Sequence, residues 1–536
     1  MKKIDRRSIL KATPALAVSA AIGGRTGTAW ADDRKDTLLS VSETGPNSLD
    51  SEVVGANRAA LEVTWNTYDR LCTFGLKQDE NGNDYYDYTN IQPELAEEWN
   101  VTDQSITFKL RKDATFHDGT PVTAKDVKYS YDRAIGVGGY PKFIFGAVSM
   151  TKPEQFVAVD DHTFRIDYIR RDPYTLPYAA APVSFILNSE LVKQHSTEAD
   201  PWGVLWTKNN TAGGGAYKVD RWTPGQEIVY VRNEHWNCGT KPKIQRIIAR
   251  VVPSAATRRA LVERGDVDFS FEMPPKDASD LSNNKQLKVI SALMDNTVVF
   301  LSMNVTTPPF DNPKVRQAIS YAIPYQQILD LAVYKRGRVL AGGPDKVTTP
   351  NWPQPGPYKT DIEKAKALLA EAGFPNGFET TLSYDLGNVV TDETTSILIQ
   401  NSLAQIGIKI SLNKIPGANW RSELTSKKLP FLVDIFGGWL AYPYFYFGFV
   451  YADKTALHDT AVYQNDAMNK LIEESHFSSD PKAMDAAATK YIQMAWDELP
   501  YISLYQPSSN VVMKNNIGGF SYWFFRQLDY RKFTKV

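Results

Sequence analysis

The chain has 536 residues, of which 43% are hydrophobic and 23% charged, and its formal net charge is −1. This length exceeds one ordinary hydrophobic core, so we expect at least two lobes that each bury their own interior. The proportions are those of globular proteins and argue against disorder. A nearly neutral chain also lacks the basic face that nucleic acid binding requires.

Residues 1–31 have the pattern of an export signal. A basic start, MKKIDRRSILK, is followed by a short, mildly apolar run and by the small-x-small sequence Ala29-Trp30-Ala31. Arg6-Arg7 followed by Ser8 resembles a twin-arginine signal, although a general secretory signal also begins with basic residues. The apolar run is shorter than the roughly 20 residues that a membrane-spanning helix needs.

Removal of this signal leaves 54 Lys and Arg residues against 60 Asp and Glu residues, a net charge of −6. No other stretch of about 18 uninterrupted apolar residues occurs, so we expect the mature chain to have no membrane span. The sequence therefore predicts a periplasmic protein of a Gram-negative bacterium.

The first third of the chain is rich in short strands. Alternating apolar residues predict strands at 37–43 and 106–111, and a two-strand hairpin at 156–168. Between them, Thr123 is placed to cap a helix that has Asp126 at its third position. This part of the chain therefore predicts mixed helices and strands.

Alternation of helices and strands continues to the end of the chain. A helix is expected to begin after Ser254 and to stop near Gly265, directly before an apolar strand. Asn312 is expected to cap another helix. Residues from about 300 to 500 alternate as one mixed-sheet lobe, and 500–513 return to strand character.

The residues that most often carry chemistry do not form a recognisable active site. Six scattered histidines give no metal-ligand spacing, and the sequence contains neither a nucleophile elbow nor a phosphate-binding loop. We therefore expect no catalysis, no metal and no cofactor. Cys72 and Cys238 either form a disulfide in an oxidising compartment or remain free thiols.

Several segments together resemble the oligopeptide- and dipeptide-binding proteins of ABC importers, the solute-binding protein family 5. They occur in the order of the family and cover nearly the whole mature chain. They are ATFHDGTPVTAKDVKYSYDRA (114–134), TAGGGAYKVDRW (211–222) with NEHW (233–236), VERGDVDFSF (262–271), FLSMNVTTPPFDNPKVRQAISYAI (300–323), AKALLAEAGFPNGF (365–378) and GGW (437–439).

The resemblance implies an α/β fold of the type II periplasmic-binding-protein class, in which two lobes with mixed sheets close over a ligand. Two hinge strands are expected near 298–304 and 500–506. The implied division is lobe I at 32–299 plus 506–536, with an inserted subdomain at about 76–184, and lobe II at 300–505.

The resemblance also implies a ligand site in the aromatic stretch that begins at Asp434. Family members that bind free peptides hold the charged peptide ends with an arginine and an aspartate, whose positions here are occupied by Phe436 and Tyr442. Neither residue forms a salt bridge, so a neutral or weakly charged ligand is favoured. Gly438 would let a ligand approach the backbone, and Trp439 with Tyr442 would form an aromatic wall.

Four further residues are candidate ligand contacts, each with a structural alternative. Asn47 lies in the loop after the first strand and is at least as well explained as a turn residue. Met303, Asn304 and Tyr505 lie on the expected hinge strands, where packing explains them about as well. The rings of Phe445, Phe447 and Phe449 are expected to be core.

The predicted function is that of a monomeric periplasmic receptor that captures a small organic solute and delivers it to the permease and ATPase of an ABC importer. A peptide or opine-like conjugate and a carbohydrate-containing ligand are both open. A secreted hydrolase or glycosidase with the same cleft is the alternative from another class, and chemoreception or a chaperone role is a third.

Overall fold

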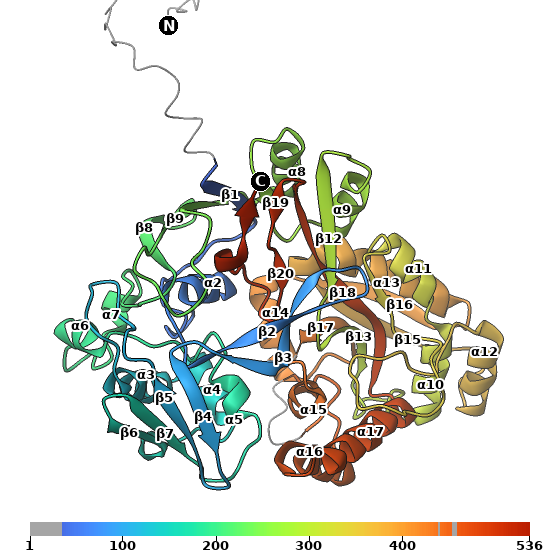
Figure 1. Cartoon of the computed structure of the whole chain (residues 1–536). Helices are drawn as coiled ribbons and strands as arrows, with labels where there is room; N and C mark the ends of the chain where they lie inside the picture. The colour runs from blue at the N-terminus through green and yellow to red at the C-terminus, as the bar shows by residue number, and fades with distance from the viewer. Residues whose placement is uncertain (1–34, 438–439, 453–457) are drawn as a thin grey trace, which may run out of the picture.

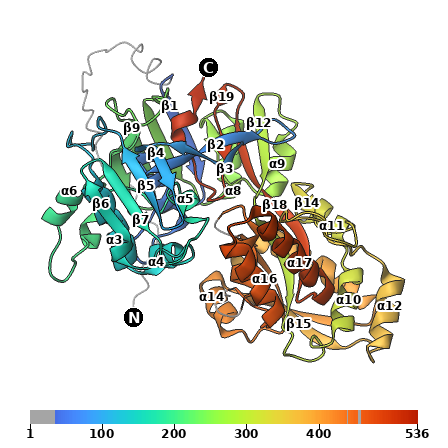
Figure 2. The same cartoon turned by 60° about the horizontal axis from the view of Figure 1, so that its bottom comes forward.

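The protein is described by a computed structural model that covers residues 35–437, 440–452 and 458–536. The predicted export signal and the candidate residues Gly438 and Trp439 lie outside the described residues. The described backbone contains a 12-stranded sheet that extends through both lobes, together with smaller sheets (Figure 1). Figure 2 shows the two lobes side by side.

Lobe I is built on one end of the large sheet, in the strand order β18-β11-β1-β10-β9-β8. The strands are β1 (Thr37–Ser42), β8 (Tyr217–Thr223), β9 (Glu227–Arg232), β10 (Arg246–Val251), β11 (Phe269–Ser270), β12 (Leu287–Leu293) and β18 (Tyr501–Lys514). The helices are α2 (Arg58–Thr67), α6 (Ser189–Gln194), α7 (Val204–Thr207), α8 (Ala255–Glu263) and α9 (Pro275–Leu281). The predicted helix after Ser254 is confirmed as α8, because the Ser254 hydroxyl accepts a bond from the Thr257 amide at 3.3 Å.

A subdomain is inserted in lobe I. Its sheet has the order β4 (Ala96–Val101), β5 (Ser105–Leu110), β7 (Thr163–Asp167) and β6 (Phe156–Asp160), so the predicted hairpin is confirmed. The helices are α3 (Ala124–Gly136), α4 (Gly139–Gly146) and α5 (Thr175–Tyr178), with the short turn η1 (Pro153–Gln155). The cap of α3 is also confirmed, because the Asp126 carboxylate accepts from the Thr123 amide at 3.0 Å and from its hydroxyl at 2.8 Å.

Small sheets attach the C-terminal residues to lobe I. Strands β2 (Cys72–Gln78), β3 (Asp84–Pro93) and β20 (Ser521–Tyr522) form one, and β19 (Ile517–Gly518) with β21 (Thr534–Lys535) forms another. The turn η3 (Tyr530–Lys532) lies between them in the chain. The last residues of the chain therefore belong to the first lobe.

Lobe II contains the other end of the large sheet, in the order β16-β15-β17-β13-β18. Its strands are β13 (Thr297–Met303), β14 (Gly337–Val339), β15 (Glu379–Asp385), β16 (Lys409–Ile415) and β17 (Phe431–Gly437). Its helices are α10 (Pro313–Ala322), α11 (Tyr325–Leu331), α12 (Ile362–Glu371), α13 (Val389–Ala404), α14 (Gly417–Ser426), α15 (Pro443–Val450), α16 (Asp466–Phe477) and α17 (Pro481–Glu498), with the turn η2 (Leu386–Asn388). The predicted cap of α10 is confirmed, since the Asn312 side chain accepts from the Lys314 amide at 3.0 Å.

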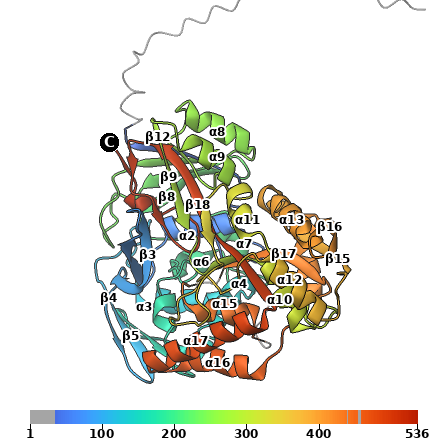
Figure 3. The same cartoon turned by 90° about the vertical axis from the view of Figure 1, so that its right-hand side faces the viewer.

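Two chain segments connect the lobes. Strand β18 pairs with β13 in lobe II through residues 501–505 and with β12 in lobe I through residues 508–514, and Figure 3 shows it running between the lobes. The second connection joins β12 to β13. The two segments bond to each other, since the Met294 backbone amide donates to the Pro507 carbonyl at 2.9 Å and the Gln506 side-chain amide donates to the Met294 carbonyl at 2.9 Å.

The two cysteines are free thiols in this structure, which is the second of the two alternatives given above. Cys72 begins β2 and Cys238 follows β9, and both side chains are buried. Burial raises the pKa of each thiol above its usual range, since a thiolate loses its hydration there. Both residues therefore serve as small apolar side chains in the core of lobe I.

Candidate functional site

The carboxyl ends of parallel strands define a candidate site edge in each lobe. In lobe I, β1 runs parallel to β10 and β11, and in lobe II, β15 runs parallel to β16 and β17. Ligands of open α/β sheets bind outside the carboxyl ends of such strands. The candidate ligand contacts are therefore the loops that follow β1, β10 and β11, and those that follow β15, β16 and β17.

Several predicted contacts belong to the interior of lobe II. Met303 and Tyr505 have exposed fractions of 0% and 2% and pack in the core of this lobe. Asn304 uses its side chain locally, because its amide donates to the Lys427 carbonyl at 3.1 Å and its oxygen accepts from Thr306. The structure assigns all three to the lobe itself, so we remove them from the candidate site.

The side chains of Phe436 and Asn47 also make their contacts within their own lobes. The Phe436 ring is nearly buried against Tyr446, Phe449 and His458 of lobe II. The Asn47 side chain is exposed, but its amide donates to the Gly55 carbonyl and its oxygen accepts from the Asn57 amide at 2.8 Å. Asn47 is therefore a loop-bracing residue, which is the structural alternative given above.

Tyr442 lies where the two lobes meet. Its hydroxyl donates to the Tyr88 carbonyl of lobe I at 3.4 Å, and its ring centroid lies 4.8 Å from that of Tyr174. The side-chain amide of Asn296, in the connecting segment, donates to the Tyr442 carbonyl at 3.1 Å and to the Leu440 carbonyl at 2.7 Å. The loop after β17 is thus bonded to lobe I and to the hinge.

The aromatic residues of α15 extend this contact. Tyr174 of the inserted subdomain stacks on Tyr444 at 5.7 Å with an interplanar angle of 8°, and its ring lies 5.1 Å from Phe445. Phe143 of α4 lies 5.2 Å from Phe449. Ring pairs at these separations stabilise a contact beyond the area that they bury. Phe445 and Phe449 are buried as predicted, but part of their burial comes from the other lobe.

A buried polar pair also joins the lobes. His476 Nε2 of α16 lies 2.8 Å from Asp172 Oδ2 of the subdomain, with side-chain exposures of only 4% and 0%. The same carboxylate accepts from the Ser149 hydroxyl at 2.9 Å and from the Tyr174 amide at 3.0 Å. These bonds hold Asp172 in place on lobe I, so the contact with His476 forms only when the lobes are together.

Replacing Asp172 by alanine should favour separation of the lobes. Removing one partner of a buried polar pair at an interface costs about 2–5 kcal/mol, because the other partner stays desolvated. We expect a larger radius of gyration for the ligand-free variant in small-angle X-ray scattering. The exposed pair Arg170–Glu473, at 2.9 Å and with exposures of 51% and 62%, provides the control Glu473→Ala, which should change the profile little. Identical profiles for both variants would contradict this role of Asp172.

In lobe I, the edge at the carboxyl ends of β1, β10 and β11 contains a cavity of about 70 Å³. Its lining includes Arg58, Glu62, Trp222, Glu272 and Gln527. None of these residues was predicted from the sequence, since they come from separate parts of the chain. Two local signals were present in the sequence. Arg58 begins a helix, and Glu272 is an acidic residue that closely follows an apolar strand.

Within the described ranges, no group of three or more His, Cys, Asp and Glu side chains is arranged to hold a metal ion. The same part of the chain has no helix whose length and apolar character would let it cross a membrane.

The chain resembles known binding proteins over most of its length. The model of the bacterial extracellular solute-binding proteins, family 5, matches residues 90–457. The probable D,D-dipeptide-binding periplasmic protein DdpA of Escherichia coli K12 is 26% identical over 493 residues, which are 91% of each chain. The glutathione-binding protein GsiB of the same strain is 29% identical over 418 residues, covering 76% of this chain and 78% of that protein.

Solved structures agree with the fold. The periplasmic binding protein AgaA of A. tumefaciens R10, in complex with agropinic acid, has a TM-score of 0.74 and 25% identity, covering 93% of this chain and 99% of that chain. The two-lobe fold predicted above is therefore confirmed. Because the family model covers more than half of the chain, the protein belongs to the bacterial extracellular solute-binding proteins of family 5.

Proposed function

We propose that the protein captures a small organic solute between its lobes in the periplasm and delivers it to the permease and ATPase of an ABC importer. The observation that carries the proposal is the set of bonds between lobes, above all Asp172–His476 and Tyr442–Tyr88. Each of these contacts joins the two lobes, so it requires the lobes to be together. A ligand that touches both lobes adds to them, so its binding shifts the population towards closure.

Ligand binding is assigned here to the loop after β17. In this proposal Trp439 and Tyr442 form an aromatic wall, and Gly438 lets the solute approach the backbone. The similar proteins named above are described as binding a D,D-dipeptide, glutathione and agropinic acid. These names favour a peptide or opine-like solute over an oligosaccharide for this chain.

Export and assembly complete the proposal. The protein enters the periplasm of a Gram-negative bacterium through a twin-arginine signal at residues 1–31, and it acts as a monomer without enzymatic activity. No observation favours the hydrolase alternative, since the proteins that the chain resembles are named for binding.

A combined stability and scattering experiment tests the receptor function. The mature protein is mixed with candidate solutes, and the products are analysed by mass spectrometry. A receptor returns its solute unchanged, gains about 2.7 kcal/mol of stability at a hundredfold excess over Kd, and contracts in solution. A solute that is chemically converted, or that binds without any change in the scattering profile, would refute the proposal.

A further inference from the structure

Two arginines of lobe I lie together without acidic partners. Arg58 is the first residue of α2, at the edge where β1, β10 and β11 end, and its Nη1 donates to the Phe525 carbonyl at 3.4 Å. Arg526 is the next residue after that carbonyl. Among the described residues, neither guanidinium has a carboxylate oxygen within 4 Å. Many exposed arginines in this chain, such as Arg264 with Asp266 at 2.8 Å, do have such a partner.

The surroundings of Arg58 show that it lines a crevice. Its side chain is exposed to solvent, yet loss of hydration is the main cause that lowers its pKa to about 10. Arg58 is one of the residues that line the cavity of about 70 Å³ described above, which places its side chain in a hollow of the surface. The positive charge of Arg526 lowers the same pKa further, while the charges of Tyr140, Glu272 and Tyr522 oppose the shift. Two like charges are therefore held close together.

The backbone at this place is also unusual. Arg526 and Glu272 adopt left-handed conformations with φ of 53° and 51°, although neither is glycine. Side chains other than glycine rarely adopt this conformation, and such residues cluster where a ligand is held. Glu272 lines the cavity together with Arg58, and Arg526 directly follows the Phe525 carbonyl that Arg58 contacts, so both backbone positions lie next to Arg58.

The adjoining cavity has room for a small charged group. Its volume of about 70 Å³ holds about five water molecules, which suits a carboxylate and its hydration. The acidic groups in its lining are Glu62, Glu227 and Glu272, and Glu227 is already paired with Arg221 and with Arg250. The Glu62 carboxylate accepts from the Tyr530 hydroxyl at 2.7 Å, and burial raises its pKa to about 7, which weakens its negative charge. The positive charge of the two arginines is therefore not fully compensated.

We propose that Arg58 and Arg526 bind a carboxylate of the transported solute. The proposal rests on the receptor function given above and specifies its substrate class, a carboxylate-bearing amino-acid conjugate. Paired guanidinium groups suit such an anion, because each presents a planar fork of donors to carboxylate oxygens. Glu272 is then placed to accept from a donor group of the same solute. The carboxylate-binding arginine that the family has at the position of Phe436 in lobe II is thus replaced by two arginines of lobe I.

Matched probes distinguish a carboxylate ligand from a neutral one and from a free anion. The mature protein is titrated with D-alanyl-D-alanine, glutathione and mannopinic acid, with the C-terminal amide of D-alanyl-D-alanine, with maltose and with inorganic phosphate. Melting temperature and isothermal titration calorimetry give the affinities. We expect at least one carboxylate probe to bind, and we expect the amide, maltose and phosphate to bind at least tenfold more weakly.

Variants connect that preference to the two arginines. Arg58→Gln and Arg526→Gln should each weaken the carboxylate probe at least tenfold, and the amide should be affected less than twofold. Arg58→Lys should retain part of the affinity, since it keeps the charge but loses the fork. Arg264→Gln, whose side chain is 61% exposed, is the matched control and should leave the affinity unchanged. Circular dichroism and the ligand-free melting temperature verify folding.

Three results would overturn the inference or its basis. Equal affinity of the carboxylate probe for the wild type and for folded Arg58→Gln and Arg526→Gln refutes the arginine site but leaves the receptor function intact. Preferential binding of maltose refutes the substrate class in the same way. If no probe binds and no solute purifies with the protein, the proposed receptor function fails as well.

Discussion

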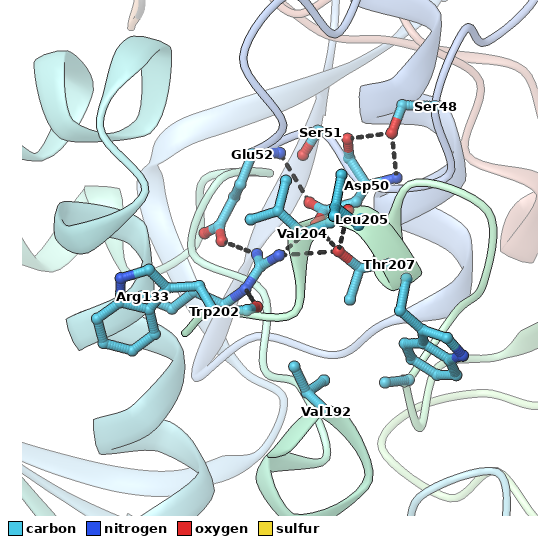
Figure 4. A network of polar contacts seen from close by, with 12 residues as sticks. Ser48, Asp50, Ser51, Glu52, Arg133, Val192, Trp202, Val204, Leu205 and Thr207 are labelled. Atoms are coloured by element: carbon cyan, nitrogen blue, oxygen red, sulfur yellow. Dashed lines mark hydrogen bonds and ion pairs between the residues drawn. The ribbon is translucent and has the colours of Figure 1, made fainter. Parts of the chain in front are cut away.

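Replacing Arg133 by methionine should lower the free energy of unfolding by about 3–5 kcal/mol. The Arg133 side chain is fully buried and donates to Asp50 at 2.6 Å, to Thr207 at 2.9 Å and to Glu52 (Figure 4). Methionine occupies a similar volume but leaves two buried carboxyl groups without a positive partner. Urea unfolding followed by circular dichroism measures the loss.

Two further variants test the reason for this loss. Arg246 pairs with Asp220 at 2.9 Å with exposures of 40% and 43%, so Arg246→Met should cost less than about 1 kcal/mol. Adding Asp50→Asn to Arg133→Met should recover part of the stability, because it removes one of the uncompensated charges. Equal losses for Arg133→Met and Arg246→Met would show that the buried network contributes no more than an exposed pair.

Replacing Asp434 by asparagine should stabilise the protein at pH 8.5 by about 2–4 kcal/mol. Asp434 lies on β17 with 6% exposure, and Trp420 Nε1 donates to it at 3.3 Å. Burial raises its pKa to about 7, and nearby Asp385 adds to the shift. Burial likewise raises the pKa of Asp392 to about 8, with a further contribution from Asp434. Asparagine keeps the acceptor for Trp420 and removes the charge.

The pH dependence has a definite sign. A carboxyl whose pKa is higher in the folded state than in the unfolded state holds its proton more tightly when folded, so folding is penalised as the pH rises from about 4 to 8. The advantage of Asp434→Asn should therefore be small at pH 5 and largest at pH 8.5. Urea unfolding of both proteins at the two pH values measures it, with Asp266→Asn on the exposed surface as the control. An advantage that is the same at both pH values would mean that the proton of Asp434 is not involved.

Much of the local structure could be predicted from the sequence. The caps at Thr123 and Asn312 and the hairpin around Asp160 depend on residues within a few positions of one another. Their hydrogen bonds form before any distant contact is needed, so residue type and spacing are sufficient. The motifs that identified the family likewise depend on order along the chain.

The candidate site could be predicted only in part. The sequence located the loop after β17, but it treated Phe436 as a ligand contact and did not identify the contact of Phe445 and Phe449 with lobe I. An aromatic residue looks the same in the sequence whether its ring packs in its own lobe or against the other lobe. Exposure and partner, which decide between these roles, depend on the folded chain.

The sequence by itself therefore determined several helices and strands with their caps and, through the motifs of the family, the two-lobe fold. The tertiary structure decided which side chains meet, because the pairs that matter lie far apart along the chain: Asp172 and His476 by 304 positions, and Arg133 and Asp50 by 83. No spacing rule reaches across such distances. Folding brings those groups together and removes water from around them, and the loss of water gives each pair its strength.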